Sequence, residues 1–284
     1  TTGLMVAVDA TCSGLQILAG LARDKSTAEL VNVVPSNKPS DAYKAVAEQA
    51  KEFLPTYMHR WMNRAVCKRT VMTIPYNATK DSSRKYIREA LLEEGIDPTK
   101  DELTQVVNAV YNSMDAIVPG PMQVMRWIKK HVGQYIRNGA TEVEWVTPSG
   151  FVVNQRRDDI ETEQMELQLL GRTRVRLPTG KTSPSPNKHK SSTAPNYIHS
   201  FDASILHRSF TKFDEPFTVI HDSVLCRAGD MGTLNALVRE TYTNIFSEEC
   251  WLSKFAETIN ASEPPPIVGT LDPKVVSNST YFFC

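Results

Sequence analysis

The sequence predicts an α+β fold in which a helical block is inserted between short β-strands. Apolar runs at 4–8 and 217–220 have the length and composition of strands, and each is followed closely by an aspartate. Residues from about 15 to about 138 show helical periodicity throughout. After Ala140 polar and apolar residues alternate around turn residues, which indicates β-hairpins. Together these observations indicate an enzyme core with a helical insertion.

The helical block is expected to contain several amphipathic helices with polar or glycine-containing ends. Their expected spans are about 15–24, 41–62, 64–75 and 81–94, with two more on either side of the break at 119–121. In the second half, strands are expected around the turn at 148–150 and in a hairpin that includes Leu169 and turns at Gly171. The Pro-, Ser- and Lys-rich stretch 178–192 is expected to be a mobile loop, and a further helix is expected around 230–247.

Composition excludes little. The chain has 284 residues, 41% of them hydrophobic, and a formal net charge of zero, so global charge gives no indication of a nucleic-acid partner. Its five cysteines are scattered without metal-ligand spacing, which favours a reducing compartment. No signal peptide or membrane-spanning apolar run is apparent. We therefore expect a cytoplasmic protein with no membrane partner.

Asp9 and Asp222 each follow a strand-like run and are each followed by a small residue. A strand end holds a carboxylate rigidly yet open to solvent, and two carboxylates on adjacent strands suit Mg²⁺, which prefers oxygen ligands. Two metal ions roughly 3.5–4 Å apart could activate a hydroxyl and stabilise a leaving pyrophosphate. Alternatively, each aspartate caps a turn, which is a common position for this residue.

Arg64, Lys68, Met72 and Tyr76 are spaced by four residues. On a helix, positions four apart lie along one stripe, which here carries two cations, then an apolar and an aromatic side chain. The order suits a nucleoside triphosphate, with Arg64 and Lys68 at the phosphates and Met72 and Tyr76 at the base and sugar. Arg69 adds a neighbouring cation. A solvated basic face over an apolar patch is the alternative.

Five segments resemble, in the same order, motifs of the single-subunit RNA polymerases of phages and mitochondria, and the resemblance covers essentially the whole chain. These segments are Asp9-x4-Gly14, the stretch 63–76 containing Arg-x3-Lys-x3-Met-x3-Tyr, Glu-Trp-Val-Thr-Pro-Ser-Gly at 144–150, Ala-Pro-Asn-Tyr-Ile-His-Ser at 194–200, and His221-Asp222-Ser223. The family has a right-hand architecture. The resemblance therefore implies an antiparallel palm sheet, a large and mostly helical fingers insertion, and a β-hairpin.

The resemblance implies that Asp9 and Asp222 are the catalytic carboxylates and bind two Mg²⁺ ions, with the backbone carbonyl of Ala10 as a further ligand. It implies catalytic roles for Lys68 and Tyr76 as well. The implied reaction is template-directed addition of ribonucleoside triphosphates to an RNA 3′ end. The residues implied in nucleotide binding are Arg64, Lys68, Arg69, Met72, Tyr76 and His199, of which Tyr76 and His199 would sense the ribose 2′-hydroxyl.

DNA contacts are implied in two places. Tyr43 falls where the family has an aromatic residue in the fingers near the template. Segment 152–185 corresponds to the hairpin that enters the promoter major groove, and it exposes Gln164, Glu166, Arg174 and Arg176. The implied division of the chain is palm at 1–25 and 200–284 and fingers at 26–199.

Two local departures from the family have structural consequences. Asn77 stands where glycine is usual, and asparagine accepts left-handed geometry better than most residues, so the turn is expected to persist. Ala10 also stands where glycine is common, which a backbone ligand tolerates. Pro75 removes a helical hydrogen bond and is expected to end or kink the helix just before Tyr76.

Two other functions remain open at this stage. Family-A DNA polymerases share the architecture, but they carry a glutamate at the position of Gly14, an aromatic residue at Met72 and a glutamate at Ser223. A non-catalytic nucleic-acid-binding subunit would use the six cations and no acids found between Gln168 and Lys190. For His199, a purely structural role is the alternative to ribose sensing.

A second polypeptide is expected as a partner. The run 4–8 has the composition of a strand buried on both faces, yet the chain offers few strands to flank it. The thumb, the promoter-binding N-terminal domain and the first palm segment of the family have no counterpart here. We expect the partner to carry them, and the assembly to transcribe phage genes in the cytoplasm of an infected bacterium.

Overall fold

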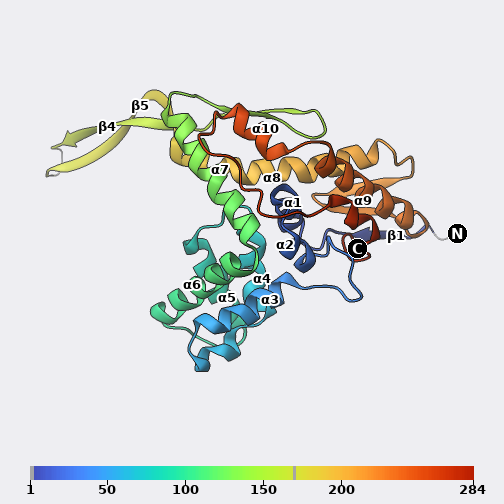
Figure 1. The fold of residues 1–284 in the computed structure, drawn as a ribbon. Coiled ribbons are helices and arrows are strands. Elements are labelled where there is room, and N and C mark those ends of the chain that lie inside the picture. Colours follow the sequence, from blue (N-terminus) through green and yellow to red (C-terminus); the bar gives the residue numbers. More distant parts are fainter. Residues whose placement is uncertain (1–2, 169–170) are drawn as a thin grey trace.

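The computed structural model describes residues 3–168 and 171–284 and shows a helical protein with three small antiparallel sheets (Figure 1). Its mixture of helices and strands is compatible with the predicted α+β class. Leu169, expected in the hairpin, lies outside the described residues. Across the described part of the chain, no helix is both long and apolar enough to cross a membrane.

The first sheet joins the two ends of the chain. Its order is β1-β7-β6, with β1 at Met5–Val8, β7 at Ser223–Arg227 and β6 at Phe217–Ile220. Both pairings are antiparallel, and Val8 lies opposite Val224. The expectation that residues 4–8 form a strand buried on both faces is wrong: β1 is an edge strand, and Met5 is 41% exposed. Only one face of the sheet, which carries Val224, packs on the core.

Three helices form the core beneath this sheet: α1 at Ser13–Ala22, α8 at Pro186–Phe210 and α9 at Met231–Glu248. Tyr242 on α9 is fully buried and its hydroxyl donates to the backbone oxygen of Gln16, 2.8 Å away. A side chain at Gly20 would lie 2.7 Å from that hydroxyl, so this position of α1 requires glycine for close packing.

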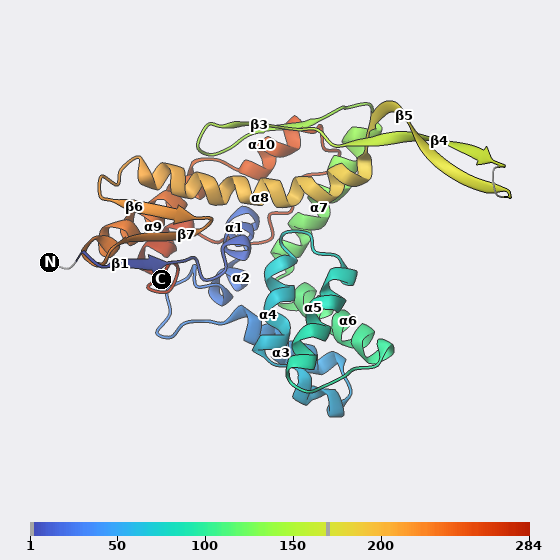
Figure 2. The ribbon, with the colours of Figure 1, turned by 180° about the vertical axis from the view of Figure 1, so that it is seen from behind.

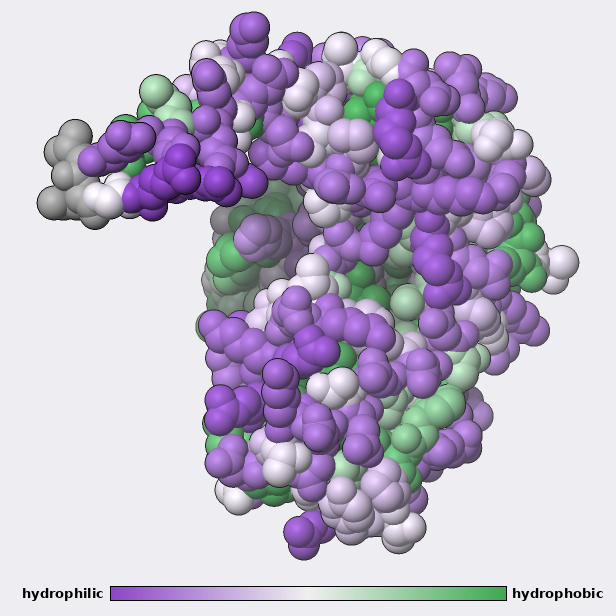
Figure 3. Space-filling view, turned by 90° about the vertical axis from the view of Figure 1, so that its left-hand side faces the viewer, coloured by the Kyte–Doolittle hydropathy of each residue, from purple (hydrophilic) through white to green (hydrophobic). Residues whose placement is uncertain are grey.

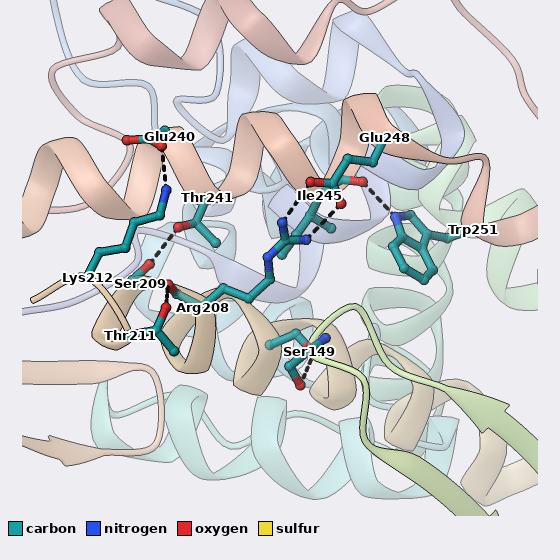
Figure 4. A network of polar contacts seen from close by, with 11 residues as sticks. Ser149, Arg208, Ser209, Thr211, Lys212, Glu240, Thr241, Ile245, Glu248 and Trp251 are labelled. Carbon is teal, nitrogen blue, oxygen red and sulfur yellow. Dashed lines mark hydrogen bonds and ion pairs between the residues drawn. The ribbon is translucent and has the colours of Figure 1, made fainter.

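Polar contacts fix α8 against α9 (Figure 4). The Arg208 guanidinium donates to both carboxylate oxygens of Glu248 at 2.7 and 2.8 Å, a two-point geometry specific to arginine. The Ser209 hydroxyl donates to Thr241, 3.0 Å away. Because α8 carries residues of the predicted site, this attachment sets their position relative to the sheet.

Most of the helical block lies below the sheet layer in Figure 1, and its last helix rises from it toward α8. Its helices are α2 (Lys25–Leu30), α3 (Ala42–Ala50), α4 (Arg64–Thr73), α5 (Lys80–Glu93), α6 (Lys100–Ile117) and α7 (Pro119–Arg137). The helix expected at 41–62 is shorter: α3 ends at Ala50 and short 3-10 segments follow at Lys51–Phe53 and Thr56–Trp61. Pro55 explains the break, because proline lacks an N–H and disfavours helical geometry in the residue before it.

Two hairpins follow the block. The first pairs β2 (Val143–Val146) with β3 (Val152–Gln155) around the expected turn. The second pairs β4 (Asp158–Leu167) with β5 (Thr173–Pro184) and projects from the body as a twisted ribbon, as both ribbon views show (Figure 2). The chain ends with α10 (Trp251–Thr258) and a 3-10 segment at Pro273–Asn278, after an earlier one at Ala228–Asp230.

The prediction of a mobile loop at 178–192 is wrong. Strand β5 continues to Pro184 because Asp158 and its neighbours pair with it, and α8 begins two residues later. Ser185 caps α8 by accepting from the Lys188 N–H, and Pro186 occupies the first helical turn, where a missing N–H costs nothing. The proposed border between fingers and palm at 199/200 therefore falls inside one continuous helix.

Candidate active site

A cavity of about 630 Å³ opens between the end of the β1-β7-β6 sheet and helices α1, α4 and α8. The sequence-predicted residues that line it come from distant parts of the chain: Asp9, Ala10, Tyr43, Arg64, Lys68, Met72, Tyr76, His199 and Asp222. We call this space the central cavity. The fold thus brings together both strand-end carboxylates, the cationic stripe and the Tyr–His pair.

The carboxylates meet because of strand register. Asp9 follows β1, and Asp222 lies in the tight turn between β6 and β7, where His221 has a φ of 57°. Antiparallel pairing of β1 with β7 brings the end of one strand beside the start of the other. Partial burial of Asp9 and the negative charge of Asp222 raise the pKa of Asp9. The two carboxylates therefore lie on adjacent strands, as the sequence predicted.

The donor set fits Mg²⁺ by its chemistry. Asp9 and Asp222 offer hard oxygen atoms, and their mutual repulsion would be relieved by a divalent cation. The described residues contain no group of three or more His, Cys, Asp or Glu side chains placed to hold a metal. Mg²⁺ commonly uses one or two carboxylates and completes its coordination with water and substrate phosphates. A two-carboxylate site is consistent with that mode.

The C-terminal residues hold the backbone of Asp9 in place. The Asp9 N–H donates to the Cys284 backbone oxygen, and the Cys284 N–H donates to the Asp9 oxygen, both at 3.0 Å. The Ala10 N–H donates to Asp9 Oδ1 at 2.8 Å, which orients the carboxylate. This bonding rigidifies the segment that would present the Ala10 carbonyl.

A third carboxylate, Asp202 on α8, also lines the central cavity and was missed by sequence reasoning. Burial, followed by the charges of Asp222 and Asp9, raises its pKa to about 7. The Ser13 hydroxyl donates to Asp202 Oδ2 at 3.2 Å. The available signal was helical spacing: Asp202 lies three residues after His199, so both project from one face of α8.

Tyr76 occupies the turn after α4. The helix ends at Thr73, before Pro75, as expected, and Asn77 adopts the predicted left-handed geometry with φ of 65°. The Tyr76 ring stacks on His199 with centroids 4.4 Å apart and an interplanar angle of 13°. Partial burial, together with the nearby charge of His221, lowers the pKa of His199 and favours the neutral imidazole.

The Tyr76 hydroxyl lies 3.2 Å from the Ser13 hydroxyl. The same serine oxygen also lies 3.2 Å from Asp202 Oδ2, so Ser13 links the tyrosine hydroxyl to this carboxyl group. A Cβ added to Gly14 would lie 3.0 Å from this oxygen. Gly14 therefore keeps the space around the Tyr76 hydroxyl open.

The residues of α4 predicted to bind the nucleotide do not all face the central cavity. Arg64, Lys68 and Met72 line the central cavity, whereas Arg69 does not. Its guanidinium instead pairs with Glu89 at 3.0 Å and lies 4.1 Å from the Tyr86 ring centroid. Arg69 is one residue, or about 100°, around the helix from Lys68, which explains its different direction.

The cations of the stripe differ in their partners. Arg64 pairs with Asp41 at 2.6 Å and its guanidinium lies 5.4 Å from the centroid of the buried Tyr43 ring. Within the described chain, no ion pair or hydrogen bond engages the Lys68 ammonium. Lys68 is therefore the cation most available to an anionic substrate.

The expected DNA-contacting residues of the hairpin lie on the projecting ribbon, not in the central cavity. Register places Gln164 opposite Arg176 and Glu166 opposite Arg174, so the four side chains share one face. Arg172, expected on the same strand face, precedes β5 and pairs with Glu166 at 2.8 Å. Seen from the side, the surface beneath the ribbon is hollowed, and both hydrophobic and hydrophilic residues are visible in the hollow (Figure 3).

The chain belongs to the DNA-dependent RNA polymerase family, whose model matches residues 1–265. It is 29% identical to the human mitochondrial DNA-directed RNA polymerase over 99% of this chain and 25% of that protein. It is 26% identical to the T7 RNA polymerase of Escherichia phage T7, over 99% of this chain and 40% of that protein. With the DNA-directed RNA polymerase of Pseudomonas phage phiKMV it shares 26% identity, over 100% and 38% respectively. The chain thus spans between a quarter and two fifths of these relatives, and the resemblance inferred from its motifs is confirmed.

Proposed function

We propose that this chain supplies the nucleotide-addition centre of a DNA-directed RNA polymerase. The observation that carries the proposal is the central cavity, where two coupled carboxylates face a free lysine and a stacked Tyr–His pair. The substrates would be ribonucleoside triphosphates, a DNA template and the 3′ end of the growing RNA.

Asp9 and Asp222, with the Ala10 carbonyl, would hold two Mg²⁺ ions. When bound, these ions would supply activation of the RNA 3′-hydroxyl and neutralisation of the leaving pyrophosphate. Lys68 and Arg64 would bind the triphosphate, which fixes the α-phosphorus for in-line attack. Met72 would pack beside the base or sugar.

Tyr76 would read the sugar as a hydrogen-bond acceptor. Its hydroxyl would donate to Ser13, 3.2 Å away, and accept from a ribose 2′-hydroxyl through a remaining lone pair. A deoxyribose lacks that donor and leaves the lone pair unmatched. His199, stacked on the ring, would hold Tyr76 in place and contact the same hydroxyl. The open space at Gly14 is consistent with acceptance of a ribose.

Two further parts of the proposal concern partners. The shared face of Gln164, Glu166, Arg174 and Arg176 would read promoter base edges. A second polypeptide would cover the outward face of the β1-β7-β6 sheet, where Met5 is 41% and Ile220 63% exposed. Such a partner would carry the thumb and the first palm segment. Transcription of phage genes in a bacterial cytoplasm stays a prediction, since both phage and mitochondrial polymerases are among the relatives.

The decisive experiment is RNA synthesis by the complete polymerase with Mg²⁺, template and all four ribonucleoside triphosphates. Asp222→Asn is expected to abolish synthesis while template affinity stays near that of the unchanged protein. Asp230→Asn, at a carboxylate outside the central cavity that pairs with Arg227, is the matched control and should remain active. Full activity of Asp222→Asn would support the alternative of a non-catalytic binding subunit.

A further inference from the structure

A second recess lies on the other side of the Tyr76 turn, between α7 and the first turns of α8. Its volume is about 480 Å³, and we call it the basic recess. The side chains that define its charge and hydrogen bonding are Lys129, Lys130, Arg137, Lys190, Asn77 and Asn187. No carboxylate is among the residues that line it.

Most of this positive charge is uncompensated. Lys130 pairs with Glu263 at 2.5 Å, but across residues 3–168 and 171–284 no ion pair reaches Lys129, Arg137 or Lys190. Burial and the neighbouring Arg126 lower the pKa of Lys129, so an anion at this point would stabilise its charged form. A concentration of cations without acids is a surface feature suited to polyanions.

The position of Lys190 is built into the packing of the two helices. Gly133 faces α8 from the interior of α7, and a Cβ there would overlap the Lys190 side chain. Glycine inside a helix is destabilising relative to alanine. Here it provides the space in which the aliphatic part of Lys190 lies, and Lys190 also lines the basic recess.

A direct connection joins the basic recess to the central cavity. Asn77 follows Tyr76 in the chain, lines the basic recess, and donates through Nδ2 to the Ser191 backbone oxygen at 2.8 Å. The two spaces are therefore separated by a single turn. A strand with one nucleotide beside Tyr76 would place the phosphates of its neighbours at the basic recess.

We propose that the basic recess binds the phosphodiester backbone of the template DNA strand just outside the central cavity. This proposal rests on the proposed function. The two other anionic substrates would bind inside the central cavity. Arg64 and Lys68 would bind the triphosphate, and the RNA 3′ end must lie at Asp9 and Asp222. The template pairs with the incoming base, so it enters at the Tyr76 end of the stripe, which the basic recess adjoins.

The test is salt-dependent binding of the complete polymerase to a template annealed to an RNA primer. Replacing Lys129, Arg137 and Lys190 with alanine together should flatten the slope of log affinity against log salt by about 2, since each single-strand phosphate contact contributes about 0.7. The control is Lys212→Ala, just beyond the other end of α8, where the lysine is already paired with Glu240 at 2.7 Å. It should leave the slope unchanged. The conservative variant Lys190→Gln keeps the folded packing on Gly133 and should lower the slope by about 0.7.

Neutral methylphosphonate linkages identify the strand. Placed in the template next to the templating base, they should weaken binding to the unchanged polymerase but not to the triple variant. Equal sensitivity of both proteins, or sensitivity only when the linkages lie in the RNA primer, overturns the proposal. An unaltered slope in the triple and Lys190→Gln variants also overturns it. Primer extension by the unchanged polymerase, measured in parallel, separates this failure from failure of the proposed function.

Discussion

Replacing Tyr76 with phenylalanine isolates one oxygen atom of the central cavity. The ring would keep its stacking on His199 at 4.4 Å, and α4 and the Asn77 turn would be unaffected. Only the hydroxyl that lies between Ser13 and the cavity is lost. The change should therefore alter sugar selection without a comparable loss of ribonucleotide incorporation.

The magnitude follows from the hydrogen bonds involved. A neutral hydrogen bond contributes about 0.5–1.5 kcal/mol, so losing the acceptor for the 2′-hydroxyl should reduce preference for ribonucleotides roughly two- to thirteen-fold. Ser13→Ala should give a smaller change in the same direction, because the hydrogen bond that holds the Tyr76 hydroxyl in place is then lost.

The assay is single-nucleotide addition to an RNA primer, with kcat/KM measured for matched ribo- and deoxyribonucleoside triphosphates. Tyr57→Phe is the control, since its exposed hydroxyl bonds Glu102 at 3.2 Å outside the central cavity. If the ratio of the two kcat/KM values in Tyr76→Phe equals that of the unchanged protein, Tyr76 does not sense the ribose.

Further predictions address the other groups. His199→Ala should relax sugar selection in the same direction, by loss of the ring that supports Tyr76, and the same assay checks it. Lys68→Ala should lower kcat/KM for all four nucleotides about 13- to 160-fold, since bonds to charged groups contribute about 1.5–3 kcal/mol; a loss confined to one base would contradict a phosphate role. Arg174→Ala should change base preference on a randomised promoter pool, and an unchanged preference would count against the hairpin. The pKa of Asp202 is raised from 3.8 to about 7, so its neutral form is favoured in the fold and stability should fall as pH rises from about 4 to about 7. Asp202→Asn should remove that fall in urea unfolding with EDTA; an identical pH profile would refute it.

Local sequence signals were sufficient for much of the site. The strand-end carboxylates, the four-residue stripe and the Asn77 turn each depend on short-range spacing or backbone preference, and the structure places them together. The paired strands around Met165 and Arg174 were also predictable, because polar and apolar residues alternate there.

The features that the sequence did not predict, or predicted wrongly, depend on long-range contacts. Asp202 is one carboxylate within a helix, and only folding brings it to Ser13 and the two strand-end aspartates. Apolar composition indicated a strand at 4–8 but could not reveal how many neighbours it has. The Pro- and Ser-rich stretch 178–192 carries loop-like composition, yet its serine and proline act as a helix start once β4 pairs with β5.

The projecting ribbon has an evolutionary consequence. Most side chains of β4 and β5 are exposed and contribute nothing to the core, so stability places little constraint on their identity. Mutations there could accumulate without weakening the central cavity. However, Gln164 faces Arg176 and Glu166 faces Arg174, so a charge altered on one strand changes the surroundings of its cross-strand neighbour. A substitution on one strand of this surface would therefore be accompanied by a compensating substitution on the other. Related chains should show covariation between these facing positions.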